Sequence, residues 1–157
     1  MIKTNAMRLL ESQGIAFKTQ DYAVDENDLS GEHVAHQVGK PAEQVFKTLV
    51  LRGENSGYFV CCIPSNFEVD LKKAARAIKD KKAEMIHLKD LQKITGYIRG
   101  GCSPVGMKKD FPTFIDETAI LFDEIMISAG VRGTMMIIEP KDLINYVNAE
   151  IIDLVKS

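Results

Sequence analysis

Residues 95–109 form a glycine-rich segment that is hard to explain as core or as an ordinary turn. The segment holds four of the chain's eleven glycines, with Arg99 and Pro104 inside it and two lysines at its end. Glycine reaches positive φ and lets a ligand approach main-chain N–H groups, so such a run can form a concave surface lined with donors. A wide connection between two strands would have the same composition. Two other stretches of similar character, around Lys47 and over residues 128–133, favour a binding site.

Lys47 stands in a strongly apolar run, residues 45–51, that is typical of a β-strand. Its neighbours include Phe46 and Leu49, so its ammonium group can project from a mostly buried strand into a cleft. A lysine in that setting can hold a phosphate or polarise a carbonyl. The alternative is a lysine whose stem lies along a strand edge while its charge stays in water.

Residues 128–133, Ser-Ala-Gly-Val-Arg-Gly, form a turn of small residues that also carries a hydroxyl and a guanidinium. Such a turn can bind an oxyanion or a ribose, although a plain β-turn has a similar composition. Ser128 is not part of a Gly-x-Ser-x-Gly elbow, and no fixed spacing pairs it with a histidine. We therefore do not expect a serine nucleophile.

The chain's 157 residues, 45% of them apolar and 27% charged, fit one globular domain over residues 1–157. No apolar run approaches the length of a membrane span, and the first residues lack the long apolar segment of a signal peptide. We therefore expect a cytoplasmic protein without a membrane partner.

The three cysteines, Cys61, Cys62 and Cys102, show neither an even disulfide framework nor a Cys-x-x-Cys metal spacing. Reduced thiols are expected, and the two adjacent cysteines should point to opposite faces of a strand. His33 and His36 share a helical face, but the chain has only one other histidine, so surface histidines are favoured over a metal pair. We expect no metal and no cofactor.

The formal charge of -2 argues against a protein that coats nucleic acid without selectivity. The basic residues are unevenly distributed, since residues 72–82 contain six lysines and arginines against Asp80 alone. This basic ridge can meet a polyanion locally, although a merely solvated helix face has the same pattern.

Hydrophobic periodicity and turn residues predict an alternation of short helices and strands. Helices are expected over residues 4–13, 34–38, 70–78 and 88–94, with a last one beginning at Pro140. Strands are expected over residues 15–22, 45–51, 58–63, 84–86, 112–116, 124–128 and 134–138, with a hairpin turn at residues 53–57. The expected helix caps are Thr4 or Asn5, Ser30 and Asp70. The pattern indicates an α/β domain.

A series of short motifs along the chain resembles the YbaK family of aminoacyl-tRNA deacylases. In chain order the motifs are Phe46-Lys47-Thr48-Leu49, Asp70-Leu71-Lys72-Lys73, Thr95-Gly96-Tyr97, residues 100–109 (Gly-Gly-Cys-Ser-Pro-Val-Gly-Met-Lys-Lys), Ile115-Asp116, Ser128-Ala129-Gly130 and Arg132-Gly133. The likeness spans nearly the entire chain and extends, more distantly, to the inserted editing domain of bacterial prolyl-tRNA synthetase. It implies a single α/β (α+β) domain with a mixed, barrel-like β-sheet flanked by helices.

The resemblance also implies an activity, the hydrolysis of mischarged Cys-tRNA(Pro), with Cys-tRNA(Cys) as a second substrate. Prolyl-tRNA synthetase accepts cysteine because a hydrophobic site discriminates weakly between side chains of similar size, so a second enzyme must remove the error. Members of the family are thought to use no protein nucleophile. The substrate's own thiol attacks the ester carbonyl, while the enzyme orients the ester and stabilises charge. The implied partners are the aminoacylated 3′ end of tRNA and prolyl-tRNA synthetase.

Matching positions imply roles for particular residues. Lys47 matches the family lysine and, as the catalytic residue, would hold the terminal adenosine's phosphate or the reacting ester. The substrate-binding positions match Tyr22, Thr48, Gly101, Ser128 and Arg132. Cys102 is not implied as a nucleophile. Met135 is a departure, because some relatives carry an aspartate there, and the amino-acid specificity of this chain can therefore differ.

Two alternatives accompany this leading hypothesis. One is a deacylase of another mischarged tRNA, such as Ala-tRNA(Pro). The other is a non-catalytic module that binds tRNA or a nucleotide in the same pocket. The leading hypothesis requires Lys47, Gly101 and Ser128 to lie around one cavity, on the same side of the sheet.

Overall fold

The computed structural model describes residues 3–157, so the first two residues of the expected 1–157 domain lie outside the described range. The helices are α1 (Asn5–Ser12), α2 (Gly31–Val38), α3 (Leu71–Ala77), α4 (Leu91–Thr95) and α5 (Pro140–Val147), with the 3-10 turns η1 (Ala42–Gln44), η2 (Leu88–Asp90) and η3 (Glu117–Leu121). The strands are β1 (Lys18–Asp21), β2 (Phe46–Gly53), β3 (Gly57–Pro64), β4 (Ala83–Met85), β5 (Thr113–Asp116), β6 (Ile125–Ser128), β7 (Thr134–Ile138) and β8 (Glu150–Ile152).

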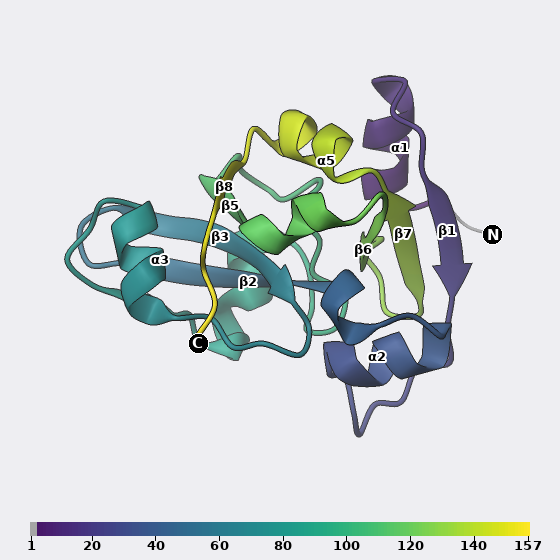
Figure 1. Ribbon diagram of the computed structural model, residues 1–157, viewed down its shortest axis with the longest axis horizontal. Helices are drawn as coiled ribbons and strands as arrows, with labels where there is room; N and C mark the ends of the chain where they lie inside the picture. The colour runs from purple at the N-terminus through teal and green to yellow at the C-terminus, as the bar shows by residue number, and fades with distance from the viewer. Residues whose placement is uncertain (1–2) are drawn as a thin grey trace.

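The strands form two sheets, one of five strands and one of three (Figure 1). The larger has the order β4-β2-β3-β5-β8 and is mixed, because β2 runs antiparallel to β3 and β4 while β5 runs parallel to β3 and β8. The smaller is antiparallel, in the order β1-β7-β6. A parallel bridge between Val45 and Met126 links the two. The expected α/β domain with a mixed sheet is confirmed, whereas the ladders within residues 3–157 do not close into a barrel.

Strand β3 is covered on both faces, as its two cysteines illustrate. Cys62 packs in the core between the two sheets, which includes Phe46, Ile115 and the apolar side of α1. Cys61 belongs to a separate core in which α3 covers the larger sheet. The expectation that the adjacent cysteines point to opposite faces is confirmed, and both are free thiols.

The predicted caps form as the sequence indicated. Thr4 accepts a hydrogen bond from the amide of Met7, and Ser30 accepts one from the amide of His33. Asp70 accepts bonds from the amides at the start of α3, and Pro140 opens α5. These contacts are local, so short sequence patterns suffice to predict them.

Several boundaries differ from the prediction. The first strand begins at Lys18 rather than at residue 15, because β1 pairs only with Thr134 to Ile137 of β7. Residues 88–94 divide into η2 and α4, and residues 150–152 form a strand, β8, that was not predicted. None of the helices within residues 3–157 is long and apolar enough to cross a membrane.

Candidate functional site

A cleft of about 360 Å³ lies between the start of α2, strand β2, the η2–α4 region and residues 99–102. Four of the six site residues predicted from the sequence line it: Tyr22, Lys47, Thr48 and Ser128. Lys47 and Ser128 therefore share one cavity, and they are two of the three residues that the leading hypothesis places around it. Gly101 and Arg132 are not among the lining residues, although Gly100 and Cys102 on either side of Gly101 are.

Lys47 enters the cleft from β2, directly after Phe46, which is buried in the core. Its Nζ donates a hydrogen bond to the carbonyl of Ser65 at 3.4 Å. Ser65 is itself buried and fixed, because its hydroxyl donates to the carbonyl of Ala42 at 2.8 Å. Burial lowers the pKa of the Lys47 ammonium, while the negative charges of Glu32 and Glu68 oppose that shift.

Ser128 is the last residue of β6 and is buried. Its hydroxyl accepts a hydrogen bond from the amide of Gly130 at 3.1 Å, which leaves the hydroxyl proton free to donate to a ligand. Met135 pairs with Ser128 across the β6–β7 ladder and is 5% exposed. Since Met135 lines the same cleft, this wall is apolar beside Ser128.

Two thiols lie near the cleft, and both are held in the protonated form. Burial raises the pKa of Cys102, which lines the cleft, to about 12. Burial also raises the pKa of Cys62 to about 12, and its Sγ lies 3.8 Å from the hydroxyl of Thr48. Because the thiolate is the nucleophilic form, neither cysteine is set up to attack an ester at neutral pH.

Gly101 and Arg132 hold two loops together behind the cleft wall. The amide of Gly101 donates to the carbonyl of Ile98 at 3.0 Å, so it is already paired. Nε of Arg132 donates to the carbonyl of Arg99 at 2.7 Å. A Cβ on Gly101 would lie 3.1 Å from the carbonyl carbon of Val131 and 3.2 Å from the amide nitrogen of Arg132. The loops therefore meet backbone to backbone, and this contact sets the position of Arg99 and Gly100.

We expect Gly101→Ala to force these loops apart, since both crowded neighbours are backbone atoms that cannot rotate away. Overpacking of this kind typically costs about 1–3 kcal/mol. Urea unfolding should report that loss, and turnover of a substrate bound in the cleft should fall several-fold. Gly14→Ala is the control. Alanine would be strained there by the φ of 70°, but its Cβ would meet nothing within 4 Å. It should lower stability and leave turnover intact, and equal effects of both changes on turnover would refute the argument.

Glu32 and Ser65 are cleft residues that sequence reasoning missed. The charged residues that line the cleft are Glu32, Lys47 and Arg99. Arg99 carried a signal, because it interrupts the glycine-rich segment. Glu32 carried none, since its place in the cleft depends on a contact between distant parts of the chain.

The glycine-rich segment borders a second cleft as well. Pro104, Gly106, Met107 and Lys109 line a larger cleft of about 780 Å³, whose other lining residues come from α1, α5 and the region around β5 and β8. The site residues predicted from the sequence do not line it. The segment therefore borders both clefts, and its residues Arg99, Gly100 and Cys102 line the one that contains Lys47.

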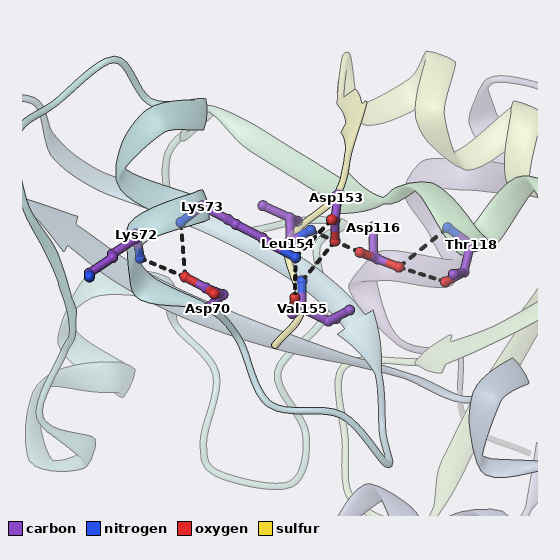
Figure 2. Close-up of polar contacts among 8 residues, drawn as sticks. All are labelled: Asp70, Lys72, Lys73, Asp116, Thr118, Asp153, Leu154 and Val155. Atoms are coloured by element: carbon purple, nitrogen blue, oxygen red, sulfur yellow. Dashed lines mark hydrogen bonds and ion pairs between the residues drawn. The ribbon is translucent and has the colours of Figure 1, made fainter. Parts of the chain in front are cut away.

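The basic ridge of residues 72–82 lies away from the cleft that contains Lys47. One of its lysines has a structural role, because Nζ of Lys73 donates to Asp153 and to the carbonyl of Val155, each at 2.7 Å (Figure 2). Contact of the other basic residues with RNA remains a prediction. Within residues 3–157 no group of three or more His, Cys, Asp or Glu side chains could hold a metal ion.

Comparisons with known proteins agree on one kind of domain. A model described as the aminoacyl-tRNA editing domain matches residues 26–146. A protein of Enterococcus faecalis, provisionally named Cys-tRNA(Pro)/Cys-tRNA(Cys) deacylase EbsC, is 46% identical over 152 residues, which cover 97% of this chain and 93% of that protein. The proline-tRNA ligase of Fervidobacterium nodosum is 30% identical over 82 residues, 52% of this chain and 14% of the ligase. A crystal structure of a provisionally assigned trans-editing enzyme for prolyl tRNA synthetase covers 100% of both chains, with a TM-score of 0.84 and 24% identity, and shares the fold.

Proposed function

The chain belongs to the aminoacyl-tRNA editing domain family, and from this premise we propose that it is a trans-editing deacylase that hydrolyses Cys-tRNA(Pro), with Cys-tRNA(Cys) as a second substrate. The observation that carries the proposal is the convergence of Lys47, Ser128 and part of the glycine-rich segment (Arg99, Gly100 and Cys102) around one cleft. The name of the Enterococcus faecalis relative supports cysteine as the amino acid removed. Residues 1–157 would act as one editing domain, on the aminoacylated 3′ end of tRNA.

The proposed reaction uses the substrate's own thiol as the nucleophile. Its sulfur forms a bond to the ester carbonyl carbon as the bond from that carbon to the ribose oxygen breaks, and the departing ribose oxygen takes up the proton that the thiol releases and becomes a hydroxyl. The products are the deacylated tRNA and a cyclic thioester of cysteine, which water then hydrolyses to free cysteine. Lys47 supplies a partly buried positive charge for the oxygen on which negative charge develops, or for the phosphate of the terminal adenosine. The raised pKa values of Cys62 and Cys102 support a mechanism without a protein thiolate.

Substrate binding would use the remaining walls of the cleft. Tyr22 and Thr48 would line the pocket, and the Ser128 hydroxyl would donate to the aminoacyl ester. We assign Gly101 and Arg132 the positioning of residues 99–100, because the Gly101 amide and the Nε of Arg132 are already paired with backbone carbonyls of residues 98 and 99. The apolar Met135 beside Ser128 suits an uncharged side chain such as that of cysteine.

A panel of purified mischarged tRNAs tests the proposed function. We expect Cys-tRNA(Pro) and Cys-tRNA(Cys) to be deacylated much faster than Ala-tRNA(Pro), and Ser-tRNA(Pro) to survive because a hydroxyl is a weaker nucleophile than a thiol. Faster loss of alanine would establish the alternative specificity. Tight binding of the acceptor end without ester loss would instead indicate a non-catalytic module.

Prolyl-tRNA synthetase is the proposed protein partner, and it can be added to the same deacylation assays. The net charge of -2 predicts modest intrinsic affinity for tRNA, so a synthetase bound to the same tRNA would help to deliver it. Adding the synthetase should lower KM for Cys-tRNA(Pro) and leave kcat unchanged. An unchanged KM over a range of salt concentrations would remove the synthetase from the proposal.

A further inference from the structure

We propose that Glu32 binds the free α-ammonium group of the substrate's amino acid, so that the cleft selects aminoacyl ends whose amine is present and charged. This inference rests on the proposed function, because it concerns the same cleft and the same ester. It adds a specificity-determining residue to a site otherwise described by Lys47, Ser128 and the glycine-rich wall.

The position of Glu32 is fixed by contacts on both sides of it. Gly31 lies so close to Ser65 that a Cβ on Gly31 would clash with the Ser65 Cβ. The carbonyl of Ser65 accepts the hydrogen bond from Lys47. Ser30 caps α2 through the amide of His33, which holds the first turn in place around Glu32. Glu32 therefore lies at the cleft entrance, within one residue of the contact that positions the Lys47 ammonium.

The charges of the cleft match those of an aminoacyl-tRNA end. Among the lining residues Glu32 is the one carboxylate, whereas Lys47 and Arg99 are the cations. The ligand has the opposite pattern, with one ammonium on the amino acid and negative charge on the phosphates of its nucleotides. Cations can serve the phosphates and the ester oxygen, but only a carboxylate suits the ammonium.

Glu32 is available for such a contact. Its side chain is exposed, and within residues 3–157 it takes part in none of the side-chain hydrogen bonds or salt bridges. Its interaction with the protein is the electrostatic one with Lys47. A carboxylate without a bonded partner can accept hydrogen bonds from a ligand ammonium without breaking a contact in the protein.

A simpler hypothesis is that Glu32 only raises the pKa of Lys47 and does not contact the substrate. Glu68 allows the two hypotheses to be distinguished. Glu68 also raises the pKa of Lys47, opposing the effect of burial. It is exposed, forms a salt bridge with Lys156 at 3.1 Å, and does not line the cleft. Glu68→Gln is thus a matched control that alters the electrostatics of Lys47 and leaves the cleft wall unchanged.

The experiment compares two CCA trinucleotides that cannot be hydrolysed. One ends in 3′-cysteinylamino-3′-deoxyadenosine, and the other carries a 3-mercaptopropanoyl group, which has the same thiol and carbonyl but no amine. Binding of each to the full chain is measured by calorimetry at pH 6.5, where an α-amino group with a pKa of about 7.7–8.0 is mostly protonated. Because the amide survives, the binding ratio is read independently of turnover.

We expect the wild type to prefer the amine-bearing analogue by about five- to tenfold, as a charge-assisted hydrogen bond would give. Glu32→Gln should reduce this ratio to about one, and Glu68→Gln should keep it. The inference is overturned if the wild type shows no preference, if Glu32→Gln retains it, or if both variants lose it equally. Failure of the wild type to deacylate Cys-tRNA(Pro) would instead sink the proposed function, and the binding ratio would still decide the role of Glu32.

Discussion

Lys47→Met is expected to reduce kcat for Cys-tRNA(Pro) deacylation by roughly 10²- to 10³-fold, the usual effect of removing one group that stabilises developing negative charge. Methionine retains the length and apolar stem of the lysine but supplies no charge and no donor. The loss should fall mainly on kcat if the ammonium meets the reacting ester. It should fall mainly on KM if the ammonium holds the phosphate of the terminal adenosine.

The stability of the Lys47→Met variant shows whether the loss of activity is specific. Burial already disfavours the ammonium, and its hydrogen bond to Ser65 is long at 3.4 Å, so urea unfolding should give an equal or slightly higher free energy. Lys141→Met, which removes an exposed lysine at the start of α5, is the matched control and should leave kcat unchanged. A folded Lys47→Met variant with kcat close to the wild type would remove Lys47 from the mechanism.

The proposed role of Lys47 predicts a pH dependence of definite sign for the reaction. Burial lowers the pKa of Lys47 below its ordinary value of about 10.4, and the charges of Glu32 and Glu68 partly offset that effect. Because the proposed mechanism needs the charged form of Lys47, activity should decline as pH rises through the lowered pKa. Glu68→Gln removes one opposing charge, so this decline should move to lower pH.

Local sequence patterns predicted the parts of the fold that depend on neighbouring residues. Ser30 and Asp70 cap helices through amides two or three residues away, and the β2–β3 hairpin closes where Gly53 pairs with Gly57. Strand β8 escaped prediction because three residues carry little periodicity and its partner, β5, lies far away in the sequence. The division of the strands into two sheets is likewise a property of long-range pairing.

The candidate site was predicted unevenly for a similar reason. A lysine in an apolar strand is conspicuous, and Lys47 does reach the cleft. A glycine can make room either for a ligand or for a neighbouring segment of backbone, and the sequence does not distinguish the two. Composition therefore could not show that Gly101 packs against Val131. Glu32 enters the cleft only because Gly31 and Ser65 touch, which no local pattern reveals.

Asp116 belongs to the Ile115-Asp116 motif noted in the sequence, and its hydrogen bonds are to other residues of the protein. Its side chain is 1% exposed, and Oδ1 accepts from the amide of Leu154 at 2.9 Å (Figure 2). Oδ2 accepts from the hydroxyl of Thr118 at 2.7 Å and from its amide at 3.3 Å. The carboxylate thus joins the end of β5 to the residues that follow β8, and it does not line the cleft that contains Lys47.

Asp116→Ala is expected to lower the free energy of unfolding by about 3–4 kcal/mol, because it removes hydrogen bonds to a charged acceptor and leaves the buried Leu154 amide unpaired. Since domains of this kind are stable by only about 5–15 kcal/mol, urea unfolding should show the change clearly.

Asp116→Asn keeps one oxygen acceptor and should lose less. Asp153→Asn, at the partly buried ion pair with Lys73, is the control and should lose less, because solvent still reaches and screens that pair. If Asp116→Ala were no more destabilising than Asp153→Asn, the carboxylate would not be what anchors the C-terminal segment, and a role in binding would have to be sought for it.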